Sequence, residues 1–538
     1  MFKKFVFGLP IVVALMAISF YLGTGVQQGV ATDDFYEQYK KFQEVVKKAQ
    51  YYYVEPINWD KTMEGAISGF LEQLDPHSVY IDPKKLAKVT EDFKGEFSGI
   101  GIQFDILDKY ITVISPIPGT PAFKLGMQAG DKIIEIEGES TYGIKTEDVV
   151  NKLRGPSGSV VNVTVAREDE TEPIYFDITR AKIPLYSVES RYMIDKKTGY
   201  VSINRFAEKT AAEFEESVDK LLSQGMQELV LDLRGNPGGL LDQAFEITNL
   251  LLKKKGEVIV STKGRVPGTD YEYYSRGGGK YGDLPVIILI SRGSASASEI
   301  VSGAMQDLDR GLVIGQDSFG KGLVQKQYPL NDGSAMRLTT ARYYTPSGRL
   351  IQKHYEKGLQ GKLDYYKNAY SHKNFEAIKD SLEEADLMFE TKYLKRKVYG
   401  GGGIHPDYET LPDTTGDYKF MSKIISKRIP FEFATDFCRE NPNVGKDFDK
   451  FLNDFEITDT QLKEVARIAK EKKIEFKDES FEDESNARWI KNLVKAEMAL
   501  NFWDRDHYYR VRAVNDKQLQ DALKFFPEAR EFSDVADK

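Results

Sequence analysis

Residues 291–325 read SRGSASASEIVSGAMQDLDRGLVIGQDSFGKGLVQ, and the rest of the fold is interpreted outward from this stretch. The run just before it, VIILI at residues 286–290, is uniformly apolar and predicts a buried strand. Small residues at 293–298 predict a tight turn, and a helical pattern with an apolar face that includes Ile300 begins at about Glu299. The stretch therefore predicts a strand, a tight turn and a helix in succession.

A hydroxyl group in this turn suits a nucleophile. A side chain at such a position is exposed, lies near the positive end of the helix dipole and has backbone N–H groups beside it. Attack on a carbonyl carbon creates an oxyanion, which needs such donors. Ser296 followed three residues later by Glu299 also fits a capping box. The local pattern leaves both interpretations open.

Composition limits the class of protein. A chain of 538 residues exceeds what one hydrophobic core supports, so we expect three or four domains. The net charge of −9, with no basic cluster in the sequence, argues against nucleic acid as a partner. Cys438 is the single cysteine, which excludes an intrachain disulfide. The 5 histidines lack metal-ligand spacing, so no metal site is expected, and no cofactor is predicted.

The first 30 residues address the compartment. Lys3 and Lys4 precede an apolar run at residues 5–22, which suits a short membrane span or a long signal-peptide core. No convincing small-x-small cleavage site follows, so an uncleaved anchor is the first interpretation, a cleaved signal peptide the second and a cytoplasmic protein the third. The positive-inside rule then predicts that Lys3 and Lys4 lie in the cytoplasm and that the chain after about residue 30 lies on the periplasmic side of the cell envelope. The protein would be either anchored to the inner membrane or exported.

Residues 31–95 predict a helical region and the start of the core. Amphipathic patterns cover residues 33–54 and 59–74, and their expected role is docking or dimerisation into a homo-oligomer. His77 follows Pro76 in a turn and is interpreted as structural.

Residues 96–170 change to a strand pattern with one short helix at 146–153. The order of elements resembles a circularly permuted PDZ domain, and Ala129-Gly130-Asp131 followed by spaced isoleucines carries much of the resemblance. The resemblance implies that a glycine-rich loop binds a peptide's C-terminal carboxylate through backbone N–H groups, while the peptide adds as a strand beside the helix. The residues so implied are Ser98, Gly99, Ile100 and Gly101 in the loop, and Val149 and Leu153 on the helix. Alternatively, Gly99 and Gly101 only allow a β-turn.

Two glycine-rich loops follow in residues 171–414, where strands and helices alternate again. RGNPGG at residues 234–239 lies between a strand and a helix, so its N–H groups could form half of an oxyanion hole, a phosphate-binding turn or a plain connection. Gly315-x-x-x-x-Gly320-Lys321 has P-loop spacing, but Gly322 replaces the hydroxyl residue and a strand-like segment follows. Nucleotide binding is therefore not predicted.

Together these segments resemble the C-terminal processing proteases, also called tail-specific proteases, over residues 51–408, about two-thirds of the chain. The motifs that carry the resemblance are LVLDLRGNPGG (229–239), GSASASEI (293–300), SFGKGLVQ (318–325), TTARYYTPSGRLIQ (339–352) and GGGGIHPD (400–407).

The resemblance implies the catalytic residues: Ser296 as nucleophile, Lys321 as general base, Gln325 to orient the lysine, and the N–H groups of Gly239 and Ala297 as the oxyanion hole. A lysine with an ordinary pKa of about 10.4 is protonated at neutral pH, so burial must lower its pKa. A Ser–Lys pair can replace Ser-His-Asp. The implied function is a serine endopeptidase whose partners are proteins or peptides with a free apolar C-terminus.

The resemblance also implies an α/β fold, in which a crotonase-like βαβ spiral core is interrupted by the PDZ domain. Residues 353–399 form a charged insert that we expect to be helical, and residues 415–538 predict a helical C-terminal domain. Neither carries a functional motif. One rival interpretation is a PDZ scaffold with a silent hydrolase-like core, against which intact Ser296 and Lys321 argue. Another is a different hydrolase or an acyl-CoA enzyme, against which the PDZ segment and Gln325 argue.

Overall fold

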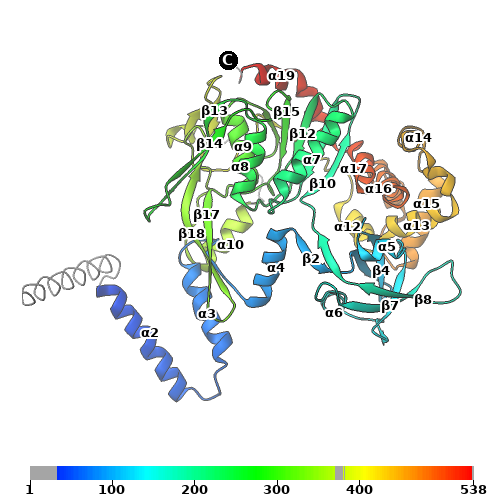
Figure 1. Ribbon diagram of the computed structural model, residues 1–538, viewed down its shortest axis with the longest axis horizontal. Coiled ribbons are helices and arrows are strands. Elements are labelled where there is room, and N and C mark those ends of the chain that lie inside the picture. Colours follow the sequence, from blue (N-terminus) through cyan, green and yellow to red (C-terminus); the bar gives the residue numbers. More distant parts are fainter. Residues whose placement is uncertain (1–32, 370–379, 381, 536–538) are drawn as a thin grey trace, which may run out of the picture. The chain divides into compact units, whose positions relative to one another are not determined.

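The computed structural model describes residues 33–369, 380 and 382–535 (Figure 1). The chain divides into two compact units, residues 1–70 and residues 71–538. The apolar run at residues 5–22 lies outside the described residues. Of the helices within the described ranges, none has the length and apolar character needed to cross a membrane.

The first unit contains α2 (Asp33–Tyr52) and most of α3 (Trp59–Glu72). One surface of α2 exposes the aromatic side chains of Phe35, Tyr36, Tyr39 and Phe42. Phe35 and Tyr39 stack with their ring centroids 6.1 Å apart, as expected for residues four apart on a helix.

In the second unit, residues 102–179 form a sheet with the strand order β3-β4-β5-β7-β8 and two short helices, α5 (Pro121–Lys124) and α6 (Thr146–Leu153). We call this the PDZ-like sheet. β6 (Glu139–Ser140) pairs with β5, while β2 (Glu96–Gly99) and β9 (Ala181–Pro184) pair separately, where the chain enters and leaves this region. β3 is an edge strand. The strands are β3 (Ile102–Leu107), β4 (Tyr110–Pro116), β5 (Lys132–Ile136), β7 (Val160–Ala166) and β8 (Ile174–Thr179).

A six-stranded sheet with the order β10-β11-β12-β15-β16-β21 forms the centre of the second unit. β10 and β11 are antiparallel, and the remaining neighbours are parallel. Every residue of the three middle strands is buried, as the continuous apolar pattern predicts. The strands are β10 (Val188–Met193), β11 (Thr198–Ile203), β12 (Glu228–Asp232), β15 (Val286–Ile290), β16 (Leu312–Gly315) and β21 (Tyr408–Glu409).

Helices cover both faces of this central sheet. Alternate strand residues such as Leu231 and Ile288 pack with α7 (Thr210–Ser223), α8 (Leu241–Leu250) and α9 (Ala297–Asp307). The residues between them, such as Val230 and Ile287, pack with α17 (Arg505–Ala513), α18 (Lys517–Ala522) and α19 (Phe526–Val535). Figure 1 shows this last helix, in red, beside the green strands of the sheet. The end of the chain therefore completes a core begun far earlier in the sequence.

A second sheet is antiparallel and contains β17, the strand that follows Lys321. β18 pairs with β1, β13 and β17, and β14 pairs with β13. α4 (Pro83–Lys94) follows β1 and ends at Gly95, whose φ is +67°. The strands are β1 (Val79–Ile81), β13 (Lys255–Gly264), β14 (Tyr271–Arg276), β17 (Leu323–Pro329) and β18 (Ala335–Tyr344).

The insert at residues 353–399 is only partly helical, which corrects the sequence prediction. α10 (Gly358–Ala369) is a helix, but β19 (Met388–Glu390) and β20 (Lys397–Tyr399) form an antiparallel hairpin. Val398 and Tyr399 are buried, and this burial decides the structure more than the charged composition does.

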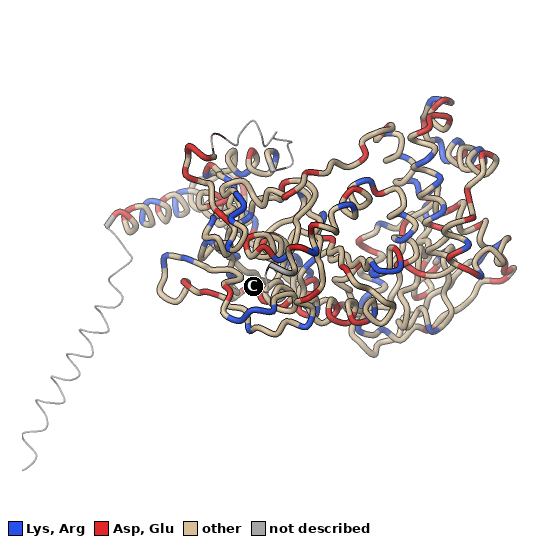
Figure 2. The backbone as a smooth tube through the Cα atoms, turned by 90° about the horizontal axis from the view of Figure 1, so that it is seen from above, with Lys and Arg blue, Asp and Glu red and all other residues tan. Residues whose placement is uncertain are grey.

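The C-terminal region is helical and has its own apolar cluster, which includes Phe420, Phe451 and Ile490. Its helices are α12 (Tyr418–Ser426), α13 (Ile429–Glu440), α14 (Phe448–Asp454), α15 (Asp459–Glu471) and α16 (Glu484–Phe502), with short 3₁₀ turns at Pro442–Lys446, Asp478–Phe481 and Leu523–Phe525. Figure 2 shows acidic and basic residues interspersed along the described chain.

Candidate active site

Three loops meet at the carboxyl ends of neighbouring parallel strands. Residues 233–240 follow β12, residues 291–296 follow β15 and residues 316–322 follow β16. Backbone hydrogen bonds join them: Ala295 N–H donates to the Asn236 carbonyl at 3.0 Å, and Phe319 N–H donates to the Ser294 carbonyl at 2.9 Å. This edge of a parallel sheet is where open α/β folds place their ligand sites.

Ser296 stands between β15 and α9 in a strained conformation. Its φ is +56° and its ψ is −111°, a region that residues with a Cβ rarely adopt. The turn directs the backbone sharply from the strand into the helix. Ser296 is half-buried, and it is the N-cap residue of α9. Residues with strained backbone conformations are common at functional sites, where contacts with the surrounding structure stabilise them.

The two neighbouring serines have different environments. Ser294 and Ser298 both have 0 % exposure. The Ser294 hydroxyl donates to the Leu233 carbonyl at 2.7 Å, and the Ser298 hydroxyl donates to the Asn236 carbonyl at 3.0 Å. Of the three serines in the SASAS run, Ser296 alone is accessible, so the other two hold the turn against the loop after β12.

Glu299 joins the serine turn to the lysine loop. Its carboxylate has 0 % exposure and accepts hydrogen bonds from the N–H of Ser296 at 2.7 Å and of Lys321 at 2.9 Å. It also accepts from Gly320 N–H at 2.7 Å and from the Ser318 hydroxyl at 2.5 Å. Burial raises the pKa of this carboxyl group, while the four donors oppose the rise. The predicted capping contact therefore exists, but the same carboxylate also fixes a second loop.

Tyr343 on β18 makes a second connection between Ser296 and Lys321. Its hydroxyl lies 2.7 Å from the Lys321 carbonyl and 3.1 Å from the Ser296 carbonyl. The tyrosine is fully buried, so this contact is shielded from water. Glu299 and Tyr343 together fix the backbones of Ser296 and Lys321 from two sides.

The Lys321 side chain is oriented by Gln325. Its Nζ donates to Gln325 Oε1 at 2.9 Å, and Gln325 Nε2 donates to the His77 carbonyl at 2.6 Å. Burial, and secondly the nearby positive charge of Arg337, lowers the pKa of Lys321 to about 8. Roughly a tenth of this amine is then neutral at pH 7, and the neutral form is what a general base requires.

The loop after β12 presents Gly238 beside Ser296, and Gly239 follows next to Phe206. The Phe206–Gly239 bridge uses the Gly238 carbonyl and the Leu240 N–H, so the Gly239 N–H is left out of that pairing. Ala297 is the first residue of α9, and an N–H at that position has no partner within its own helix. Both N–H groups are thus suited to hold an oxyanion.

We predict that Gly238→Ala lowers kcat/KM by about 100-fold, because a small displacement of reacting groups has an effect of that order. Gly238 has a φ of +94°, and a Cβ there would lie 2.6 Å from Ala295 O and 2.8 Å from Ser296 Cβ. Gly235→Ala is the matched control, since its φ is +70° and no atom lies within 4 Å of the added carbon. Steady-state peptide cleavage by both variants tests this, and equal losses would contradict it.

The residues predicted to bind a peptide tail are placed as follows. Ser98 and Gly99 lie in β2 and pair with Lys182 and Ala181 of β9, so the predicted loop is partly a strand. Gly101 has a φ of +86°, and a Cβ there would lie 2.3 Å from Thr120 Cβ, so the turn requires glycine.

Val149 and Leu153 face inward from α6. They are 0 % and 4 % exposed and belong to the core of the PDZ-like sheet. Both side chains therefore take part in core packing, and their contact with a peptide tail stays a prediction.

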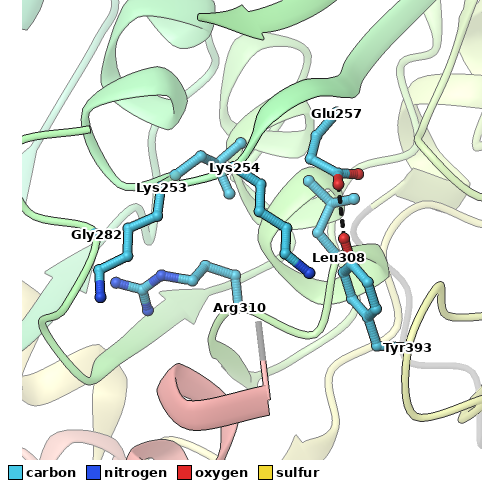
Figure 3. Close-up of a pocket in the computed structure, with 8 residues that line it drawn as sticks. Lys253, Lys254, Glu257, Gly282, Leu308, Arg310 and Tyr393 are labelled. Carbon is cyan, nitrogen blue, oxygen red and sulfur yellow. Dashed lines mark hydrogen bonds between the residues drawn. The ribbon is translucent and has the colours of Figure 1, made fainter. Parts of the chain in front are cut away.

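The cavity in Figure 3 is separate from these loops. Its volume is about 10 Å³, room for roughly one water. It lies at the C-terminal end of α9, whereas Ser296 begins that helix. Tyr393 donates to Glu257 across it at 2.6 Å (Figure 3). The residues that line it are Leu252, Lys253, Lys254, Glu257, Gly282, Leu308, Arg310 and Tyr393.

The sequence is similar to known protein families and to individual proteins. The sequence profile of peptidase family S41 matches residues 197–361, and that of a PDZ domain matches residues 112–167. The activating protease CtpB N-terminal domain matches residues 23–85, and a family of unknown function matches residues 420–504. The carboxy-terminal-processing protease of Bartonella bacilliformis is 39% identical over 352 residues, which are 65% of this chain and 79% of that protein. The chain belongs to the carboxy-terminal processing proteases.

Two further similarities involve members of this protease family. The carboxy-terminal processing protease CtpB of Bacillus subtilis is 37% identical over 57% of this chain and 64% of its own length. The solved PDZ domain of a carboxy-terminal protease from Vibrio cholerae, in complex with peptide, is 33% identical over 17% of this chain and 99% of its own, with a TM-score of 0.16. This carboxy-terminal processing protease is a serine-type peptidase with a PDZ domain, and the predicted α/β fold with helical terminal regions is confirmed.

Three residues that support the site of this protease were not predicted from the sequence. The sequence identified Glu299 only as a capping residue. Tyr343 lies inside the TTARYYTPSGRLIQ motif, and nothing in the sequence distinguishes it from the other residues of that motif. His77 was interpreted as structural, yet its carbonyl holds Gln325. A capping glutamate with 0 % exposure is the one signal that a solvent-accessibility prediction could have found.

Proposed function

We propose that this protease is an endopeptidase of the cell envelope that recognises the C-terminal tail of a protein through its PDZ domain and cleaves with Ser296 and Lys321. The observation that carries the proposal is the double connection of these two residues by Glu299 and Tyr343. The lowered pKa of Lys321, about 8, supports the role of general base.

In the proposed reaction, neutral Lys321 Nζ takes the hydroxyl proton of Ser296 as Oγ bonds to the scissile carbonyl carbon. The N–H groups of Gly239 and Ala297 hold the oxyanion of the tetrahedral intermediate. When the carbon–nitrogen bond breaks, Lys321 returns the proton to the leaving amine and an acyl-enzyme remains. Water then attacks the ester with Lys321 again as the base, which releases the acid and regenerates the Ser296 hydroxyl.

Tail recognition is proposed at β3, the terminal strand of the PDZ-like sheet in the described part of the chain. An edge strand offers unpaired backbone groups to which an extended peptide can add. The Ile100 carbonyl accepts from Ala122 N–H at 3.0 Å. A trans peptide points its N–H opposite its carbonyl, so the Gly101 N–H faces away from that turn and suits a carboxylate. The substrate class is thus a protein with a free C-terminus, and an apolar terminal residue is part of the proposal.

We predict that amidating the C-terminus of a protein substrate lowers its cleavage rate at sub-saturating concentration by about 10-fold or more, because hydrogen bonds to a charged group are lost. An Asp-terminated tail should be equally poor. The measurement compares one substrate with free, amidated and Asp-terminated tails. Equal rates for all three would remove tail recognition from the proposal.

A pair of glycine variants sharpens that comparison. Gly101→Ala crowds Thr120 and should abolish the difference between free and amidated tails. Gly143→Ala, in the same PDZ-like sheet region, has a φ of +75° with no atom within 4 Å and should preserve the difference. A Gly101→Ala enzyme that still prefers the free tail would exclude this loop as the carboxylate site.

The cellular arrangement is also part of the proposal. We infer that residues 1–30 anchor or export the protein, leaving the peptidase on the periplasmic side of the inner membrane. The exposed aromatic side chains of α2, beginning with Phe35 and Tyr36, support self-association of this helix into a homo-oligomer. Cell fractionation tests the envelope location of the full-length protein. Sedimentation of the full-length protein and of its Phe35→Glu variant tests self-association through α2.

A further inference from the structure

Helix α10 belongs to the insert in which no functional motif was recognised, yet one of its side chains is almost completely buried. Tyr365 has 4 % exposure and packs in a small apolar cluster with Ala295 and Phe319. Ala295 directly precedes Ser296, and Phe319 lies two residues before Lys321. The matched S41 profile ends at residue 361, so Tyr365 lies outside it. An insert residue therefore contacts both loops of the candidate site.

The Tyr365 hydroxyl supports the backbone at Gly320, and Gln352, which bonds to Tyr365, supports the backbone at Gly322. Tyr365 donates to the Gly320 carbonyl at 3.2 Å. Gln352 Nε2 donates to the Tyr365 hydroxyl at 3.3 Å, and Gln352 Oε1 accepts from Gly322 N–H at 2.9 Å. Gly320 and Gly322 are the immediate neighbours of Lys321, and glycine backbones resist displacement poorly. These contacts hold the short segment that carries the lysine.

A second route runs through His77. Its Nε2 lies 3.2 Å from the Tyr365 hydroxyl, and its Nδ1 lies 3.2 Å from the Tyr366 hydroxyl. The His77 carbonyl in turn holds Gln325, whose Oε1 accepts from Lys321 Nζ. The two tyrosines therefore fix His77, which in turn holds Gln325, the residue that orients the lysine side chain.

The count of hydrogens gives a consistent network. Tyr365 has one hydrogen, which it donates to Gly320, so His77 Nε2 carries a proton and donates to Tyr365. Nδ1 is then the acceptor for Tyr366, whose one hydroxyl hydrogen is shared between Nδ1 at 3.2 Å and the Pro76 carbonyl at 3.4 Å. This requires a neutral imidazole, and burial together with the nearby charge of Lys321 lowers the pKa of His77 to about 3. His77 consequently stays neutral across the working pH range and contributes no charge change near Lys321.

We propose that α10 is a positioning element for the general base, in which Tyr365 and Tyr366 set Lys321 through Gly320 and through His77. The inference rests on the proposed Ser–Lys pair and assigns the insert a role in it. Tyr365 acts through other residues and touches no substrate. Loss of its hydroxyl leaves the Gly320 carbonyl and His77 Nε2 without this partner, and water then reaches the lysine more easily. Because burial lowers the pKa of Lys321, better hydration raises it.

The other charged and titratable groups around Lys321 remain in place in such a variant. Arg337 on β18 lowers its pKa, while Glu299 on α9 and Asp75 in the turn before β1 raise it. Within the described residues, the hydrogen-bond partners of the Tyr365 hydroxyl are His77, Gln352 and Gly320, so neither Tyr343 nor any of these three groups loses a hydrogen bond when it is removed.

The test is the pH dependence of kcat/KM for the full-length enzyme and its Tyr365→Phe variant. The rising limb should move upward by about one pH unit, so activity below the midpoint falls about tenfold and recovers at high pH. Tyr355→Phe is the matched control, because its ring packs 6.1 Å from that of Tyr365 and it should keep the wild-type midpoint. A purely structural role would lower the melting temperature or kcat at every pH without moving the limb.

The outcomes separate this inference from the proposed function. A wild-type limb near pH 8 that stays unmoved in Tyr365→Phe would overturn the role of α10 and leave the Ser–Lys pair intact. A wild-type profile with no such limb, or an active Lys321→Arg enzyme, would overturn the Ser–Lys pair itself. Should Tyr365→Phe fail to fold, Tyr366→Phe carries the test. It should shift the limb upward by a smaller amount, and an unmoved limb there would likewise overturn the role of α10.

Discussion

Ser296→Ala is expected to lose at least about 10⁴-fold in kcat while unfolding at the wild-type temperature, because only the attacking oxygen is removed. Ser296 is half-buried and adopts a φ of +56°, which the shorter side chain of alanine tolerates no worse. The bonds of Glu299 to the backbone N–H groups of Ser296 and Lys321 remain. Peptide cleavage, together with circular dichroism of the same sample, measures the two halves of this expectation.

The serines on either side provide the controls. Ser294→Ala and Ser298→Ala each remove a buried hydroxyl that donates to a backbone carbonyl, so each should destabilise the fold by about 1–3 kcal/mol. Both should retain catalysis within about tenfold of wild type, since neither hydroxyl is accessible to substrate. If Ser298→Ala were inactive and Ser296→Ala active, the nucleophile would be Ser298.

Lys321→Arg is expected to lose about 10²–10⁴-fold in kcat/KM, the usual contribution of a general base. The guanidinium keeps the positive charge but stays protonated at any working pH. It therefore cannot accept the Ser296 proton. Lys326→Arg, an exposed position on the same strand β17 as Gln325, is the matched control and should be fully active. Near-normal activity in Lys321→Arg would make Lys321 a structural cation.

The same assignment fixes the sign of the pH dependence. The amine is an active base only when neutral, and its pKa is about 8. At pH 7 roughly a tenth of the enzyme is competent, and at pH 9 roughly nine-tenths is, so the rate rises through this range. A rate that falls between pH 7 and pH 9 would contradict the role of Lys321. His77 cannot produce this limb, because its pKa of about 3 lies far below it.

The sequence predicted those parts of the site that depend on local pattern or on recognisable motifs. The buried strand VIILI, the turn and the helix that starts near Glu299 follow from apolar periodicity and small residues. The motifs placed Lys321 and Gln325 together, and the structure brings their side chains within 2.9 Å.

What the sequence could not give is the pairing of residues distant in the chain. Tyr343 contacts Ser296 only because β18 lies beside β17, and Tyr365 reaches Gly320 across a helix whose pattern is largely polar. The insert showed the same limit, because its hairpin is decided by burial of Val398 rather than by composition. Val149 and Leu153 are buried in the core of the PDZ-like sheet, and apolar spacing on a helix does not distinguish a groove from a core.

Helices α17, α18 and α19 make the peptidase core dependent on the C-terminal region. Leu519, Phe526 and Phe532 cover the second face of the central sheet, and Asp516 pairs with Arg234 at 2.6 Å in the loop after β12. A variant without these helices would expose that face of the sheet to water and would remove the ion pair from the loop. The central sheet and the C-terminal helices are therefore expected to unfold together, so a region without a functional motif is a structural part of the catalytic unit.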